Sequence, residues 1–394
     1  MNSIALTPNG LQRRLKKHLL KAPQQFLAIT TPGFEVCLCK ELSAFPDIEI
    51  LKQVTGGVEF SGGIDAVYTL NFSLKTANRI LLRIETFIAR SYPELFNKCR
   101  KIPWELYCGF TNAVSFSVSS KTSRLHHTEN IEKAVFEAIQ EYMEKLGVRV
   151  ENKPDAPIRF HIRMSQDECT ISIDSSGELL YKRGYRTDTA FAPVRETTAC
   201  AILMAAGWEN YPCIVDPMCG SGTFLIEAAR MRLNYASGMT RSFSFENWPS
   251  YNASKWNRIK GNAFLQKKEQ VSCALYGSDI SETAVDASTA NASRAGVLPF
   301  ITFQTADCLS LTPPSDTGLL LSNLPYGKRV NAGEYDLSDF YEKFGKHLRE
   351  SFAGWDFAFV VADLLFEKKT GLRTNKEIRF HNGGIGVRLI MGRV

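Results

Sequence analysis

Residues 213–231 read CIVDPMCGSGTFLIEAARM, and this stretch decides the fold of the C-terminal half of the chain. The apolar residues 213–215 predict a short buried strand that runs directly into a glycine-containing turn. Residues 224–231 predict a helix immediately after that turn. Gly220 and Gly222 let the backbone approach a ligand closely, and the helix N-terminus supplies N–H groups that lack intrahelical partners. The stretch therefore predicts a ligand-binding turn at the end of a strand.

The turn lacks the features of two phosphate-binding motifs. Leu225 occupies the position of the third glycine in the dinucleotide-binding fingerprint. No Gly-Lys-Ser/Thr follows the turn, which excludes a P-loop. What remains is Asp216 at the strand end, followed by the two glycines. This combination suits a cationic, phosphate-free ligand such as S-adenosylmethionine better than a pyrophosphate.

The chain from about residue 187 alternates between predicted strands and helices, which is typical of an α/β fold with a parallel sheet. A turn at Asn382-Gly383-Gly384 predicts a closing hairpin. Residues 234–270 form an insertion, in which we expect Trp248 and Trp256 to pack. Strands are expected at 273–277, 301–304, 319–322 and 357–361, and helices at 195–206, 281–295 and 337–352.

Acidic residues follow the second and third of these strands. Asp279 can accept hydrogen bonds from both hydroxyls of a ribose, and Asp307 could accept one from an adenine amino group. The carboxyl ends of parallel strands meet at the edge where ligands bind in open α/β sheets. The predicted cofactor-binding residues are Asp216, Pro217, Met218, Cys219, Gly220, Ser221, Gly222, Thr223, Asp279, Ile280, Asp307 and Cys308.

The fourth strand leads into Asn323-Leu324-Pro325-Tyr326, which predicts a pocket for a planar amine. Asn323 offers a side-chain carbonyl, Leu324 a backbone carbonyl and Tyr326 an aromatic face for stacking, while Pro325 makes the turn rigid. A nucleobase amino group is a poor nucleophile and needs such positioning. The motif alone is equally compatible with an ordinary strand-to-loop turn. Its place at the fourth strand end favours a methyl-acceptor site, so these four residues are the predicted catalytic residues.

The N-terminal half reads as an α+β region without a catalytic constellation. Residues 1–25 form a basic arm, expected to be helical or loosely ordered. Strands are expected at 26–30 and 54–60 around a helix at 33–42, and a second helix at 73–90. A unit of the split β-α-β type follows, with a strand at 114–118, a helix at 131–146 and antiparallel strands at 160–162 and 169–173.

Composition narrows the class of protein further. The net charge of +6 is compatible with a polyanionic partner, and basic residues concentrate at 13–21 and 368–379. The ten cysteines show no C-x-x-C spacing, so we expect reduced thiols and no metal site. We find neither a signal peptide nor an apolar run of the ~18 residues that a membrane span needs. A cytoplasmic protein without a membrane partner or an obligate protein partner is expected.

The motifs at 216–223, 277–280, 306–307 and 323–327 together resemble those of the THUMP-domain RNA methyltransferases, over nearly the whole chain. The resemblance implies a Rossmann-like class I methyltransferase domain with a seven-stranded sheet at 187–394. It implies a ferredoxin-like segment at 26–65 and a THUMP RNA-binding domain at 66–178 before it. Gly220, Gly222 and Thr223 would face the methionine part of S-adenosylmethionine. Leu324 departs from the commonest family pattern, which has proline there.

Relatives of this type methylate the exocyclic N2 amine of a guanosine in 23S rRNA or tRNA, and the same function is expected here on structured RNA. One alternative is an adenine-N6 methyltransferase acting on DNA or RNA, because the same tetrapeptide serves either amine. A second alternative is a non-catalytic RNA-binding or assembly factor. The intact Asn323, Gly220 and Gly222 argue against that loss of activity.

Overall fold

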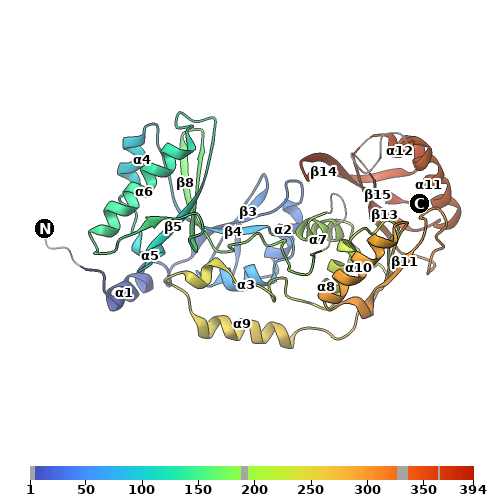
Figure 1. The fold of residues 1–394 in the computed structure, drawn as a ribbon, viewed down its shortest axis with the longest axis horizontal. Coiled ribbons are helices and arrows are strands. Elements are labelled where there is room, and N and C mark those ends of the chain that lie inside the picture. The colour runs from blue at the N-terminus through green and yellow to red at the C-terminus, as the bar shows by residue number, and fades with distance from the viewer. Residues whose placement is uncertain (1–4, 188–193, 326–335, 363) are drawn as a thin grey trace.

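The computed structural model describes residues 5–187, 194–325, 336–362 and 364–394. Its strands form two sheets, one in each half of the chain, which lie side by side in Figure 1. The N-terminal sheet has eight strands in the order β2-β3-β1-β4-β8-β7-β5-β6. The C-terminal sheet has seven strands in the order β11-β10-β9-β12-β13-β15-β14.

The N-terminal sheet is mixed, since β5 and β7 are parallel while β7 and β8 are antiparallel. Central strand β4 pairs with β1 and β8 and so joins two strand groups into one sheet. The strands are β1 Gln24–Ile29, β2 Glu49–Val54, β3 Gly57–Gly62, β4 Arg79–Ile88, β5 Ala113–Lys121, β6 Glu151–Asn152, β7 Ile158–Ser165 and β8 Glu168–Asp174. The helices are α1 Pro8–His18, α2 Glu35–Leu42, α3 Ala66–Ser73, α4 Tyr92–Cys99, α5 Glu105–Cys108 and α6 Thr128–Glu144.

The C-terminal sheet has parallel neighbours from β11 to β13, and β15 runs antiparallel to β13 and β14. The strand order reverses at β9, as in Rossmann-like folds. The predicted Rossmann-like sheet of seven strands, preceded by an α+β region, is therefore confirmed. The strands are β9 Cys213–Asp216, β10 Ala274–Asp279, β11 Thr302–Thr305, β12 Leu319–Asn323, β13 Asp356–Val361, β14 Arg373–Asn382 and β15 Ile385–Arg393. The helices are α7 Glu196–Ala205, α8 Thr223–Arg232, α9 Ala253–Leu265, α10 Glu282–Arg294, α11 Leu337–Ser351 and α12 Leu365–Thr370.

The predicted helix at residues 73–90 is wrong, because this segment contains the end of α3 and then the strand β4. The run Ile80-Leu81-Leu82 is buried on both faces of the sheet and therefore does not alternate between apolar and polar residues. A short continuous apolar run cannot be told from a buried helix by its periodicity. Pairing with β1 and β8 decides the outcome here.

One further strand expectation in the N-terminal half changes, and the helix expected in the basic arm is present. The segment expected as one strand at 54–60 contains a turn, and β2 pairs with β3 across it as a hairpin. The basic N-terminal arm includes α1, whose Leu11 and Leu15, together with Leu19 just after the helix, are buried in the core of the N-terminal half. Their spacing places them on one face of the helix. The cations of α1 lie on its other faces, where Arg13, Lys16 and Lys17 are exposed.

The insertion between α8 and β10 leaves the C-terminal sheet and packs on the N-terminal half. Trp248 and Trp256 are buried as expected, but in the same core as the N-terminal sheet. The ring of Trp256 lies edge-on to Phe72 of α3, with 5.2 Å between centroids. The two halves are thereby joined through the insertion as well as through the chain between β8 and α7.

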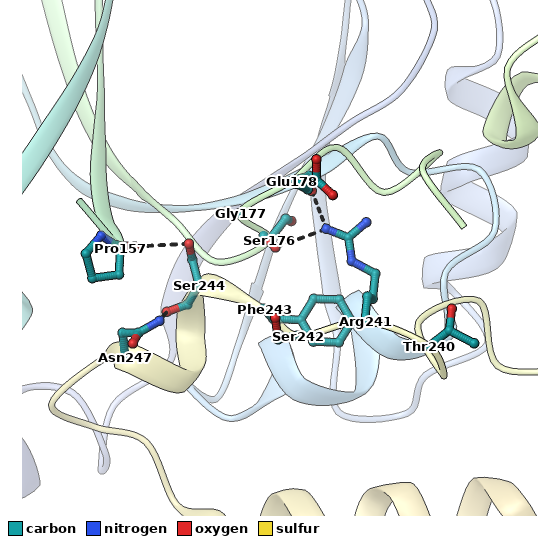
Figure 2. A pocket seen from close by; sticks show the side chains of 10 residues that line it. All are labelled: Pro157, Ser176, Gly177, Glu178, Thr240, Arg241, Ser242, Phe243, Ser244 and Asn247. Carbon is teal, nitrogen blue, oxygen red and sulfur yellow. Dashed lines mark hydrogen bonds between the residues drawn. The ribbon is translucent and has the colours of Figure 1, made fainter. Parts of the chain in front are cut away.

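A polar pocket of about 430 Å³ lies where the insertion meets the N-terminal half. It lies between residues 176–178, after β8, and residues 240–247 of the insertion. Figure 2 shows Arg241 pointing across the junction, where its guanidinium donates to the carbonyl oxygens of Glu178 at 2.5 Å and Ser176 at 3.4 Å. Ser244 donates to the carbonyl oxygen of Pro157 at 3.1 Å on the other side. The insertion is therefore tied to the N-terminal sheet by polar contacts as well as by aromatic packing.

Tyr68→Phe is expected to loosen this docking by about 1–2 kcal/mol of unfolding free energy. The Tyr68 hydroxyl accepts from the backbone N–H of Asn252 at 2.9 Å and donates to the carbonyl oxygen of Ser250 at 3.3 Å. Chemical denaturation of both proteins measures the loss. Tyr251→Phe is the matched control, because that ring also lies in the aromatic cluster. Equal losses in the two variants would contradict a specific role for the Tyr68 hydroxyl.

His161 of β7 is expected to make the fold sensitive to acid. Burial, with smaller contributions from Arg79 and Arg159, lowers the pKa of His161 from 6.5 to about 3. Asp174 lies 3.7 Å away, but it is already ion-paired with Arg79. Since the folded state binds the proton less well than the unfolded chain, stability is lost as the pH falls below about 6.5.

The expected loss from this group is about 1–2 kcal/mol between pH 7.5 and pH 5. His161→Gln should remove that part of the slope when unfolding free energy is measured against pH. Ser117→Ala changes the residue that faces His161 on β5 and serves as the control. An unchanged slope in His161→Gln would disprove the assignment.

Candidate functional site

The order of the C-terminal sheet brings the predicted site residues to neighbouring strand ends. β11, β10, β9 and β12 are consecutive in the sheet and parallel to each other. Their carboxyl ends are followed by or contain Asp307, Asp279, Asp216 and Asn323. These are the four strand ends that the sequence singled out, and they lie around the point where the strand order reverses.

The glycine turn after β9 is held against the end of β10. Gly220 and Gly222 have φ angles of +54° and +76°, in the left-handed region that favours glycine. The Cys219 N–H donates to the carbonyl oxygen of Ser278 at 2.8 Å, and the Gly220 N–H donates to the Asp279 carboxylate at 3.0 Å. The sequence predicted the glycines, whereas the brace from β10 is visible only in the structure.

Asp216 connects the glycine turn to β12, the strand that ends at the predicted catalytic residue Asn323. Its carboxylate is buried and accepts from the Met218 N–H at 3.2 Å and from the Ser322 hydroxyl at 2.7 Å. Ser322 immediately precedes Asn323 on β12. Sequence reasoning missed this role of Ser322, since a serine inside an apolar strand carries no signal of its partner. The bond ties the ends of β9 and β12 together.

Asp279 and Asp307 both shape the turns in which they lie. Asp279 accepts from Gly220 and also from the N–H of Ser281 at 3.1 Å. Asp307 accepts from the N–H of Leu309 at 2.9 Å and is exposed. A carboxylate has about four lone-pair sites, so each side chain retains acceptor capacity for a ligand. Ile280 lies within the turn of Asp279, and 67% of its surface is exposed.

The two cysteines of the predicted set are not positioned as nucleophiles. Burial raises the pKa of Cys219 well above its ordinary value. Burial, assisted by Asp307, raises the pKa of Cys308 to about 12. Both therefore remain protonated thiols at neutral pH. Within the described residues no group of three or more His, Cys, Asp or Glu side chains could hold a metal ion.

The remaining predicted residues of the turn are largely internal. Pro217, Ser221 and Thr223 are buried, and Met218 is half-buried. The Ser221 and Thr223 hydroxyl oxygens lie 3.3 Å apart. Thr223 is the first residue of α8, so the turn leads directly into that helix as expected.

A support behind the glycine turn was not predicted. Asn291 of α10 is fully buried and donates to the carbonyl oxygen of Ser221 at 3.1 Å. Arg294 donates to the Asn291 side-chain oxygen at 2.6 Å and to the carbonyl oxygen of Tyr185 at 2.9 Å. Residues up to 109 positions apart thus hold one turn. No local pattern in the sequence marks such partners.

The tetrapeptide at residues 323–326 begins with the last residue of β12, and the structure describes it as far as Pro325. Asn323 is the last residue of β12 and is 7% exposed, while Leu324 is fully buried. The Leu324 N–H donates to the carbonyl oxygen of Val360 at 3.1 Å, which extends the pairing with β13. Pro325 is half-buried. Tyr326 lies outside the described residues, so its predicted stacking role stays a prediction.

These residues fit the predicted cofactor. The four strand ends contribute three carboxylates and a carboxamide, a set of acceptor groups that suits a cationic group and hydroxyls. The left-handed glycines expose backbone at the start of α8. None of this chemistry requires a phosphate.

Three family models match the chain. The description "RMKL-like, methyltransferase domain" matches residues 183–390, which contain the C-terminal sheet apart from residues 391–393 of β15. "RlmL ferredoxin-like domain" matches residues 25–81, and "THUMP domain" matches residues 89–174. The resemblance inferred from the motifs is therefore confirmed. Among the described residues, no helix is long and apolar enough to span a membrane.

Individual relatives agree with the family models. Ribosomal RNA large subunit methyltransferase K/L of Psychromonas ingrahamii is 35% identical over 86% of this chain, which spans only 46% of that relative. A putative RNA methyltransferase of Synechocystis is 31% identical, over 93% of this chain and 95% of the relative. The crystal structure of SMU.472, a putative methyltransferase complexed with SAH, is 29% identical with a TM-score of 0.84, covering 95% of this chain and all of that one. The chain belongs to the RMKL-like methyltransferase family.

Proposed function

We propose that this protein is an S-adenosylmethionine-dependent RNA methyltransferase that acts in the cytoplasm on the exocyclic N2 amine of a guanosine in structured RNA. The observation that carries the proposal is the link from Asn323 through Ser322 to Asp216 and the glycine turn. It sets a predicted amine-binding group beside a predicted cofactor-binding turn. The names of the relatives support RNA as the substrate class.

The cofactor, when bound, supplies an electrophilic methyl group on a sulfonium ion. Gly220, Gly222 and Thr223 would hold its methionine part, with the N–H groups at the start of α8 available to the carboxylate. Asp279 would accept from the ribose hydroxyls and Asp307 from the adenine amino group. Asp279 would keep its hydrogen bond to the Gly220 N–H at the same time, so that one carboxylate both binds the ribose and holds the glycine turn.

The acceptor residues act by positioning the amine. The Asn323 side-chain carbonyl and the Leu324 backbone carbonyl would each accept one hydrogen of the target amino group, which fixes the direction of the nitrogen lone pair. Pro325 would keep the turn rigid, and Tyr326 would stack on the extruded base. The nitrogen is most acidic after it has gained the methyl group, so the site needs acceptors rather than a strong base.

The N-terminal half would bind the RNA. We propose a basic arm at 1–25, a ferredoxin-like segment at 26–65, a THUMP domain at 66–178 and a methyltransferase domain at 187–394. These parts would recognise structured RNA largely by its shape and by phosphate contacts. The exposed cations of α1 are available for such contacts.

Nucleoside analysis tests the proposal against its rivals. The full chain is incubated with RNA and methyl-labelled S-adenosylmethionine, and the digested RNA is separated into nucleosides. We expect label in N2-methylguanosine. Label in N6-methyladenosine would replace the guanine assignment by the adenine-N6 alternative. Absence of label together with absence of cofactor binding would support a non-catalytic assembly factor.

A further inference from the structure

Helix α9 lies apart from both sheets, along the lower edge of the molecule in Figure 1. Only one face of the helix is buried. Trp256 is 2% exposed, and Ile259 and Ala263 pack beside it against the core of the N-terminal half. Their spacing of three and four residues places them on a single stripe. The residues on the other faces of the helix are exposed.

That free surface combines exposed apolar side chains with cations. Phe264 and Leu265 are 68% and 82% exposed. Residues 253–270 contain five basic residues and one acidic residue. Lys255 pairs with Asp65 at 2.6 Å. The other four cations form no ion pair with any residue that the structure describes. These four cations and the two apolar residues are together called the α9 surface: Arg258, Lys260, Phe264, Leu265, Lys267 and Lys268.

Neighbouring groups hold parts of this surface in place. The Lys260 ammonium lies 5.1 Å from the Trp256 ring centroid, and the Lys267 ammonium lies 4.9 Å from that of Tyr235. The Lys268 N–H donates to the carbonyl oxygen of Leu233 at 2.8 Å, which anchors the segment after the helix to the end of α8. Cations with a fixed position lose less entropy when they bind an anion.

We propose that the α9 surface binds a single-stranded segment of the RNA, a contact separate from the methylation site. Its cations would contact phosphates, and Phe264 would stack on an unpaired base, which is how proteins bind single-stranded nucleic acid without sequence preference. Charge complementarity favours a polyanion, and the exposed ring favours one that carries bases. The proposal rests on the proposed function, because it takes RNA as the substrate.

Fluorescence anisotropy with the full chain and a fluorescein-labelled oligouridine tests this surface. Lys267→Gln/Lys268→Gln is expected to weaken binding about tenfold and to reduce the slope of log K against log salt by about 1.4, since each phosphate contact on a single strand contributes about 0.7. Phe264→Ala is expected to weaken binding roughly five- to hundredfold with little change in that slope.

Two variants serve as matched controls. Lys343→Gln/Lys346→Gln removes the same charge from α11, where both lysines are ion-paired, with Asp339 and Glu350. Phe110→Ala removes another exposed ring, which is 51% exposed. The α9 variants should bind S-adenosylhomocysteine as tightly as the parent, which shows that they are folded.

The outcomes separate this proposal from the proposed function. Oligouridine binding that is equal in the parent and the α9 variants would overturn the α9 surface as an RNA site. An acidic protein would then be the partner whose charge matches that of the surface. Equal weakening in the α9 and control variants would reduce the effect to net charge and would also overturn it. A parent protein that binds neither oligouridine nor folded RNA would instead count against the proposed function.

Discussion

Asn323→Ala is expected to lower kcat for methyl transfer by about 10²- to 10³-fold while leaving the Kd for S-adenosylhomocysteine within about twofold of the parent value. The side-chain carbonyl of Asn323 is proposed to contact the acceptor amine, so its loss removes positioning in the transition state. The braces of the glycine turn come from Asp279, Ser278 and Asn291, and they remain in this variant. Single-turnover kinetics and calorimetric titration measure the two quantities separately.

The control for Asn323→Ala must exclude a general loss of structure. Asn323 is buried at the end of β12, so thermal unfolding of the variant is measured alongside. Asn112→Ala, at an exposed asparagine of the N-terminal half, should change neither quantity. If cofactor affinity fell as far as kcat in Asn323→Ala, the residue would be a part of the cofactor site or of the fold rather than the acceptor site.

Asp279→Ala is expected to weaken S-adenosylhomocysteine binding by about 10²-fold, because two kinds of hydrogen bond to a charged group are lost together. The variant loses the acceptor of the Gly220 N–H at 3.0 Å, so the turn is no longer braced by this carboxylate. It also loses the proposed acceptor of the ribose hydroxyls. Isothermal titration calorimetry measures the change directly.

Asp279→Asn separates these two contributions. An asparagine oxygen can still accept from Gly220, while its amino group cannot accept from a ribose hydroxyl. We therefore expect an affinity between those of the parent and Asp279→Ala. Asp286→Ala removes an exposed carboxylate from the neighbouring α10 and should bind like the parent. Parent-like affinity in Asp279→Ala would remove Asp279 from the predicted cofactor set.

Much of the C-terminal domain could be predicted because its signals are local. An apolar strand, a glycine turn and a helix follow each other at residues 213–231, and each can be recognised within a few residues. Strands β9, β12 and β13 are buried along nearly their whole length and therefore read as continuous apolar runs. The predicted site residues were identified from equally local signals, since each of them stands at or just after the end of a predicted strand.

The N-terminal half was predicted less well for a physical reason. The segment at 73–90 has strong apolar content, which fits a buried helix or a central strand equally. Only the long-range pairing of β4 with β1 and β8 decides between them. The same pairing joins what the sequence suggested as two modules into one eight-stranded sheet.

The sequence by itself determined the identity of the groups predicted to form the site: two glycines in one turn, three strand-end carboxylates and the asparagine at the end of β12. Only the tertiary structure decided how they are held, through Ser322 on Asp216, Asn291 on Ser221 and Asp279 on Gly220. It alone decided that Trp256 of the insertion packs on the N-terminal half and leaves the α9 surface exposed. Such contacts join residues far apart in the chain, and a hydrogen bond or a packed ring leaves no trace in the local pattern of either partner.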